Sequence, residues 1–284
     1  ARALREEHDF RGYIHLKTIP EADAEIIHQA GLYADRVSIN VEMPTNAGLT
    51  RLAPDKNAGQ IEGAIARTKA RIIEAKDERK RFRHAPRFAP AGQSTQMIVG
   101  ADDANDTAII GKASRLYESF GLRRVYYSAF SPIPDASAVL PLKRPPLLRE
   151  HRLYQSDWLM RFYDYSPGDV VAATDATTGM LPLDIDPKLA WALKFRGSFP
   201  VDVNRAPREA LLRVPGLGAK AVARILAVRR HRSLRLDDVA RLTASITKVR
   251  PFICTVDWRP TLLTDRADLR GLLAPRPEQL ELFG

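Results

Sequence analysis

The feature that most constrains the fold is the alternation of strand-like and helix-like segments over the first 130 residues. Between the strand-like runs lie segments with apolar residues at helical spacing, such as Ile61, Ile65 and Ile72. Strands separated by full helices predict right-handed crossovers and a parallel sheet. Four such units can be half of a closed eight-fold barrel or part of an open one. The predicted strands span residues 12–16, 36–41, 96–99 and 125–129.

Prolines interrupt this pattern after the fourth strand. Five of them fall between residues 131 and 147, which is typical of a linker or a long surface loop. We therefore expect residues 132–196 to form a Pro-rich linker and connecting helices. On one of these helices, Trp158 and Phe162 are four residues apart, and this spacing favours core positions over a base-stacking platform.

Charge is concentrated in one part of the sequence. The 284-residue chain has a formal net charge of +10, and residues 205–250 hold twelve Lys and Arg against three acidic residues. A polyanion is the expected partner of such a segment.

The single cysteine, Cys254, excludes a disulfide framework or a cysteine-based metal site, and indicates a cytoplasmic compartment. No apolar run approaches the ~20 residues of a membrane span, so no membrane partner is expected.

The strongest local signal lies between residues 207 and 226. Pro207 suits the start of a short helix, and a second helix follows with Val222, Ile225 and Leu226 on one side. The two glycines between the helices allow positive φ and leave no side chain between the backbone and a ligand. The unpaired N–H groups that open the second helix can bind a phosphate.

This segment resembles the helix-hairpin-helix motif of DNA repair and recombination proteins. The resemblance predicts a helix-hairpin-helix domain over residues 197–256 that contacts DNA mainly at phosphates, with little sequence specificity. The alternative is a plain helical hairpin in which the glycines only permit a turn. The expected DNA-binding residues are Pro215, Gly216, Leu217, Gly218, Lys220 and Arg224.

Segments 13–17, 35–42, 92–101 and 147–155 resemble one family of radical S-adenosylmethionine proteins. Its members carry a C-terminal helix-hairpin-helix and are associated with DNA modification and repair, and with a uracil-DNA-glycosylase-like partner. The resemblance implies an α/β fold. An incomplete parallel (β/α) barrel of radical S-adenosylmethionine type over residues 1–131 would be followed by a small all-α helix-hairpin-helix domain. The resemblance also implies S-adenosylmethionine and a 4Fe-4S cluster as cofactors of the intact protein.

The chain departs from that family because the cluster-binding cysteines are absent. We expect the first two strands of the core and the cysteine loop to lie upstream of Ala1, so that this chain alone binds neither cofactor firmly and carries out no radical chemistry. If the four strands are the later ones of such a core, the cofactor lies at their C-terminal ends. The alternative is that the residues there are satisfied polar groups at a barrel rim. The cofactor-binding candidates are Lys17, Asn40, Glu42, Gly100 and Ser128.

The tail over residues 257–284 ends in a short sequence that resembles the peptide by which bacterial repair proteins bind the sliding clamp. Its candidate clamp-binding residues are Gln279, Leu280, Leu282 and Phe283, and the alternative is an ordinary frayed terminus. The expected function is the DNA-binding C-terminal part of a radical S-adenosylmethionine enzyme of DNA modification or repair. The alternative is a non-enzymatic DNA-binding adaptor that uses the barrel as a scaffold.

Overall fold

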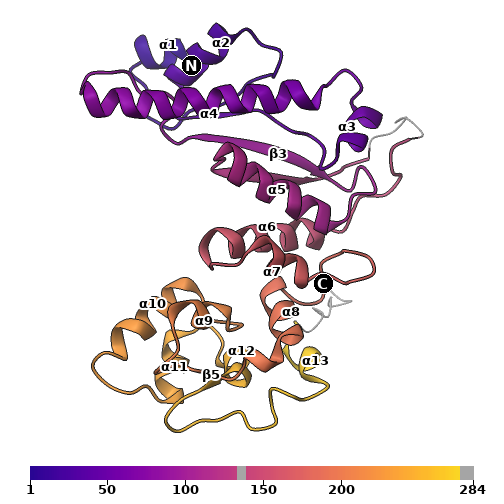
Figure 1. Ribbon diagram of the computed structural model, residues 1–284, viewed down its shortest axis with the longest axis vertical. Coiled ribbons are helices and arrows are strands. Elements are labelled where there is room, and N and C mark those ends of the chain that lie inside the picture. Colours follow the sequence, from indigo (N-terminus) through magenta and orange to yellow (C-terminus); the bar gives the residue numbers. More distant parts are fainter. Residues whose placement is uncertain (133–138, 276–284) are drawn as a thin grey trace, which may run out of the picture. The chain divides into compact units, whose positions relative to one another are not determined.

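The computed structural model describes residues 1–132 and 139–275, which belong to two compact units (Figure 1). Unit 1 comprises residues 1–150 and unit 2 residues 151–284. The division falls within helix α6 (Leu147–Phe162), inside the segment that the sequence predicts as linker and connecting helices. Among the residues that the structure describes, no helix has both the length and the apolar composition needed to cross a bilayer.

Unit 1 is built on a four-stranded parallel sheet with the order β1-β2-β3-β4. The α/β class and the parallel pairing are therefore confirmed. β1 and β4 are the two edges, so the four strands form an open sheet and not a closed barrel. The elements before α6 are α1 (Arg2–Glu6), β1 (His15–Lys17), α2 (Ala24–Tyr33), β2 (Arg36–Ser38), α3 (Asn46–Leu52), α4 (Ala58–Arg81), β3 (Gln93–Val99), α5 (Asp106–Phe120) and β4 (Arg124–Ala129).

One face of this sheet packs against helices. Val37 of β2 is fully buried in an apolar cluster that includes Ile72 and Ala75 of α4, and Leu16 of β1 packs against the same cluster. In a strand, successive side chains point to opposite faces. The other face therefore carries the register row Lys17, Ser38, Ser94 and Arg124, which crosses all four strands and is polar.

The first two strands are shorter than the sequence predicts. The Asp35 carboxylate accepts a hydrogen bond of 2.7 Å from the Ile14 N–H, so a side chain takes the place of a ladder partner just before β1. After β2, the Val41 N–H donates to Thr95 Oγ1 at 2.9 Å in the same way. The alternation of apolar and polar residues does not show where a side chain takes the place of the neighbouring strand as hydrogen-bond partner. The limits of both strands were therefore predicted wrongly.

Unit 2 is mainly helical. After α6 its elements are α7 (Pro167–Ala172), α8 (Pro187–Lys194), the 3-10 turn η1 (Arg196–Ser198), β5 (Val201–Asp202), α9 (Arg208–Arg213), α10 (Ala219–Val228), α11 (Leu236–Leu242), α12 (Ile246–Val249), η2 (Arg250–Phe252), β6 (Ile253–Cys254) and α13 (Leu269–Leu273). β5 pairs with β6 in parallel, so the prediction of an all-α domain is wrong in this respect. Strands of two residues have no periodicity that a sequence could display.

Aromatic rings fill the core of unit 2. Trp191 of α8 contacts Tyr165 and Phe199 edge-on at centroid distances of 5.6 and 6.4 Å. Trp158 and Phe162, which the sequence placed in a core, are instead 53% and 45% exposed. That prediction is wrong because α6 buries its other side, which carries Leu153, Ser156, Asp157 and Leu159.

Candidate nucleic-acid interface

The predicted hairpin is present and is closed by apolar side chains. Helices α9 and α10 lie against each other and are joined by residues 214–218 (Figure 1). Val214 and Ile225 are completely buried, and Leu217 and Val222 are 1% exposed. Leu217, one of the expected DNA-binding residues, thus anchors the turn in the interior and does not expose its side chain to DNA.

The two glycines of the turn have different roles. Gly216 has φ +82°, and a Cβ there would lie 2.8 Å from Val249 Cγ2 and 3.1 Å from Lys248 Cβ. Conformation and space therefore both require glycine at this position. Gly218 has φ −82°, and the nearest atom to a Cβ would be Tyr163 Oη at 3.7 Å. Both glycines allow positive φ, but only Gly216 adopts it, and Gly218 instead serves as the N-cap of α10 without a capping side chain.

The first turn of α10 presents free N–H groups. Ala219, Lys220 and Ala221 open the helix, where no intrahelical acceptor exists, and within the described part of the chain no other group accepts from them. The first turn contains no acidic residue. These N–H groups carry the positive end of the helix dipole, which is the usual arrangement of a phosphate-binding helix start.

Three basic residues on or beside this hairpin have no carboxylate partner among residues 1–132 and 139–275. Lys220 and Arg224 of α10 are exposed, as the sequence predicts for DNA-contacting positions. Lys248 of α12 lies beside Gly216, close enough that its Cβ limits the space there. No sequence pattern identifies Lys248, because only the packing of α12 against the turn brings it to this place.

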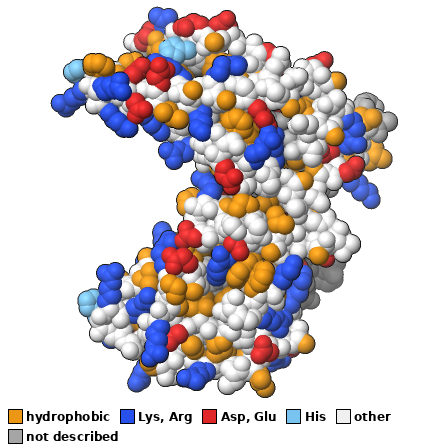
Figure 2. All heavy atoms as spheres, in the orientation of Figure 1, with side chains coloured by type: hydrophobic (Ala, Val, Ile, Leu, Met, Phe, Trp, Pro, Cys, Tyr) orange, Lys and Arg blue, Asp and Glu red, His pale blue; other side chains and the backbone are white. Residues whose placement is uncertain are grey.

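Some of the local basic side chains form ion pairs with carboxylates in the folded chain. The Arg229 guanidinium is also engaged within the protein, since it donates hydrogen bonds to the carbonyls of Val203 and Ala206 at 3.1 and 2.7 Å. On the face drawn in Figure 2, Lys and Arg side chains of unit 2 lie among acidic ones and do not form one continuous patch. The neutralising ion pairs are Arg208–Asp164 at 2.6 Å, Arg213–Asp169 at 3.0 Å and Arg232–Asp238 at 2.6 Å.

A buried lysine supports the turn from outside the hairpin. Lys188 of α8 donates a hydrogen bond of 2.6 Å to the carbonyl of Leu217, and its amine lies 4.8 Å from the ring centre of Tyr163. Burial lowers the pKa of Lys188 to about 7, although the Asp186 carboxylate opposes the shift. Lys188 therefore fixes the position of Leu217 and, through it, the turn. No local sequence signal identifies this role.

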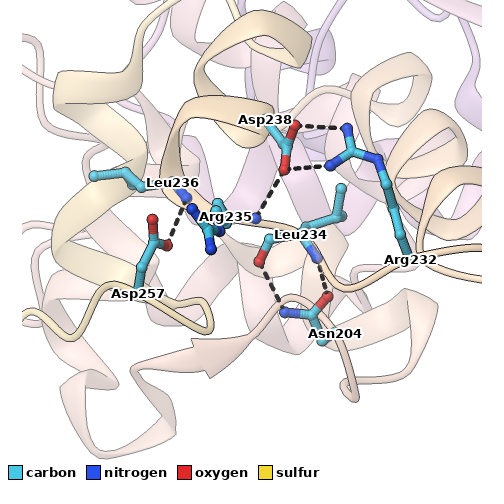
Figure 3. A network of polar contacts seen from close by, with 7 residues as sticks. All are labelled: Asn204, Arg232, Leu234, Arg235, Leu236, Asp238 and Asp257. Carbon is cyan, nitrogen blue, oxygen red and sulfur yellow. Dashed lines mark hydrogen bonds and ion pairs between the residues drawn. The ribbon is translucent and has the colours of Figure 1, made fainter.

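A polar network fixes the segment that follows α10 (Figure 3). The Asn204 amide accepts from the N–H of Leu234 at 2.7 Å and donates to its carbonyl at 3.1 Å. Asp238 accepts two hydrogen bonds from Arg232 and one from the Arg235 N–H. The Arg232 guanidinium, helped by that N–H, lowers the pKa of Asp238 to about 2. These contacts hold the start of α11.

The five cofactor-binding candidates of unit 1 lie at the C-terminal ends of the strands, as expected, but only two of them meet. Lys17 Nζ and Glu42 Oε1 are 3.9 Å apart. Glu42 also pairs with Lys56 at 2.7 Å and has φ +61°. Because both lysines neutralise it, the Glu42 carboxylate is already engaged by the protein itself.

The other three candidates are separate. Asn40 follows β2 and is 7% exposed, and Ser128 lies in β4. Gly100 follows β3 with φ +82°, and a Cβ there would lie 2.8 Å from Pro145 Cγ. The space beside Gly100 is therefore occupied by the Pro145 ring and is not open to a cofactor.

The described residues do not fit an iron-sulfur cluster. Cys254 lies alone on β6, where burial raises the pKa of its thiol. Within residues 1–132 and 139–275 no group of three or more His, Cys, Asp or Glu side chains is placed to hold a metal ion. A cluster of this type needs several thiolates close together, which a single cysteine cannot supply.

The clamp-binding candidates Gln279, Leu280, Leu282 and Phe283 lie outside the described residues.

Comparison with protein-family models, curated proteins and solved structures finds no match to this chain. The geometry of the hairpin is therefore the basis for assigning a function.

Proposed function

We propose that this chain binds DNA through the hairpin, with backbone phosphates held at the start of α10. The observation that carries the proposal is the set of unpartnered N–H groups at Ala219 to Ala221, together with the exposed Lys220 among them and Lys248, whose Cβ lies beside Gly216. Backbone amides and lysines bind phosphate in any sequence context, so we expect little sequence specificity.

Burial of the apolar residues favours a polyanion over a protein partner at this turn. Leu212, Leu217 and Val222 are all at most 1% exposed. These three side chains therefore contribute almost no apolar surface of their own to the desolvated centre that a protein interface requires. What the turn offers instead is hydrogen-bond donors and positive charge, which suit phosphate oxygens.

The resemblance to DNA-modifying radical S-adenosylmethionine proteins supports a wider proposal, in which the intact protein is such an enzyme and the hairpin delivers its substrate. No catalytic step is assigned to this chain, since its described residues do not fit the cluster. The second candidate is a non-enzymatic DNA-binding adaptor. The pairing of Glu42 with Lys17 and Lys56 favours it, because these groups already satisfy each other.

The test replaces Gly218 with aspartate. An N-cap aspartate accepts hydrogen bonds from the first N–H groups of a helix and is a preferred residue there, so α10 is preserved. The same carboxylate occupies the donors that phosphate needs and repels the backbone of DNA. We expect Gly218→Asp to abolish the binding of a labelled duplex, measured by fluorescence anisotropy, whereas Lys220→Ala lowers the log–log salt slope by about 0.9.

Gly271→Asp is the matched control, because it adds the same charge to unit 2 at a glycine with open space around its Cβ position. It should bind duplex DNA as the unmodified protein does, apart from a small effect of net charge. Equal affinities of Gly218→Asp and Gly271→Asp, with both proteins folded, would refute phosphate binding at this turn.

A further inference from the structure

A cavity of about 460 Å³ in unit 2 shares a wall with the hairpin turn. Gly216, Leu217 and Gly218 form that wall, and Trp158 and Leu159 of α6 also line the cavity. The volume lies within the range of about 300–1,000 Å³ that is usual for small-molecule sites. The cavity is therefore large enough for a planar ring ligand.

Trp158 gives this cavity an aromatic surface that the protein does not cover. Its side chain is 53% exposed, although large aromatic residues of this unit such as Trp191 and Phe199 are buried. Phe162 touches the Trp158 ring with the centroids 5.1 Å apart and the planes tilted by 59°. An exposed indole at the edge of an apolar cavity is a surface on which a nucleobase can stack, and such stacking tolerates any base.

Polar groups beside Trp158 are fixed in position. Gln155 lines the cavity, and its Oε1 accepts a hydrogen bond of 2.9 Å from Arg152. This contact orients the amide so that Nε2 keeps its two donors, for which no described residue is the acceptor. Lys188 also lines the cavity and is bonded to the Leu217 carbonyl, so the cavity wall and the turn form one fixed unit.

We propose that this cavity receives one unpaired nucleobase of the DNA strand whose phosphates the hairpin turn holds, with the base stacked on Trp158. The proposal rests on the proposed function, because the phosphate-binding turn is itself one wall of the cavity. A base is joined to its phosphate through a single sugar, so a base in this cavity and its phosphate at the turn belong to adjacent parts of one nucleotide. A paired base cannot reach such a cavity without leaving the helical stack.

The experiment compares two labelled duplexes of identical sequence, one fully paired and one with a single unpaired adenine in the middle. Affinities are measured by fluorescence anisotropy at one fixed salt concentration with the full chain. We expect the unpaired nucleotide to tighten binding about ten-fold, which corresponds to about 1.4 kcal/mol and agrees with the worth of one stacked base. Trp158→Ala should remove this gain and leave the affinity for the paired duplex unchanged.

Phe162→Ala is the matched control. It removes an aromatic side chain of similar exposure from the same helix, but Phe162 does not line the cavity, so the ten-fold preference should persist. In a second measurement, 2-aminopurine as the unpaired base should lose fluorescence on binding, and Trp158→Ala should restore it.

Two results would overturn the inference. One is equal affinity of the two duplexes for the unmodified chain. The other is a loss of equal size on both duplexes in Trp158→Ala, which would mean that Trp158 supports the hairpin as a whole. Both leave the proposed function intact as long as Gly218→Asp still abolishes binding of the paired duplex. If Gly218→Asp binds normally, the proposed function itself has failed.

Discussion

Replacing each glycine of the turn with alanine should separate two kinds of glycine. Gly216→Ala places a side chain at φ +82° and its Cβ 2.8 Å from Val249 Cγ2. The left-handed backbone costs about 1–2 kcal/mol and the overpacking about 1–3 kcal/mol, so we expect a loss of about 2–5 kcal/mol. Gly218→Ala has an ordinary φ and an ordinary contact at 3.7 Å, so its cost should be limited to the preference for glycine over alanine at an N-cap, about 1 kcal/mol.

Tryptophan fluorescence during thermal or urea unfolding reports this difference directly. The three tryptophans of the chain, Trp158, Trp191 and Trp258, all belong to unit 2, so their signal follows that unit alone. For a unit of this size a loss of a few kcal/mol lowers Tm by roughly 10 °C. We expect that decrease for Gly216→Ala and a decrease of only a few degrees for Gly218→Ala. Equal melting temperatures would refute the assignment of the turn's strain to Gly216.

Three further predictions concern contacts of single side chains. Arg149→Ala leaves the fully buried Asp106 carboxylate without its 2.8 Å partner, so unit 1 should lose about 3–5 kcal/mol in thermal unfolding followed by circular dichroism. Asn204→Ala removes both hydrogen bonds to Leu234 and should lower the urea-unfolding free energy by about 1–3 kcal/mol, more than a surface substitution does. The pKa of Lys188 is lowered to about 7, so between that pH and its ordinary value of 10.5 the unfolded chain binds the extra proton and stability rises with pH. Lys188→Met should lack this rise in urea titrations at pH 7 and pH 9.5; an identical pH profile would contradict it.

The sequence predicts those parts of the fold that rest on local periodicity. The four strands and the two helices of the hairpin follow from patterns within a few residues, and the parallel pairing follows from the helices between the strands. The side chain that replaces a ladder partner at Ile14 comes from Asp35, more than twenty positions away in the chain. No pattern within the strand itself contains that information, so its end could not be placed.

The candidate site shows the same limit more strongly. Gly216, Gly218 and Lys220 are visible as a motif, whereas Lys188 and Lys248 reach the turn only because α8 and α12 pack against it. The exposure of Trp158 was predicted wrongly because a four-residue spacing shows that two aromatic residues share a helix face. Which face is buried depends on the neighbouring elements, and those are fixed only in the folded chain.

The pairing of β5 with β6 has a consequence for how the hairpin module can be handled. Val201 lies opposite Ile253 and Asp202 opposite Cys254, so the chain enters and leaves the module at the same place. A segment whose ends meet can be exchanged as a whole between related proteins without redirecting the chain on either side. An exchange that keeps only one of these two strands would leave that strand without its partner. The ends of the segment of about fifty residues between the two positions would then have to be held together by other contacts.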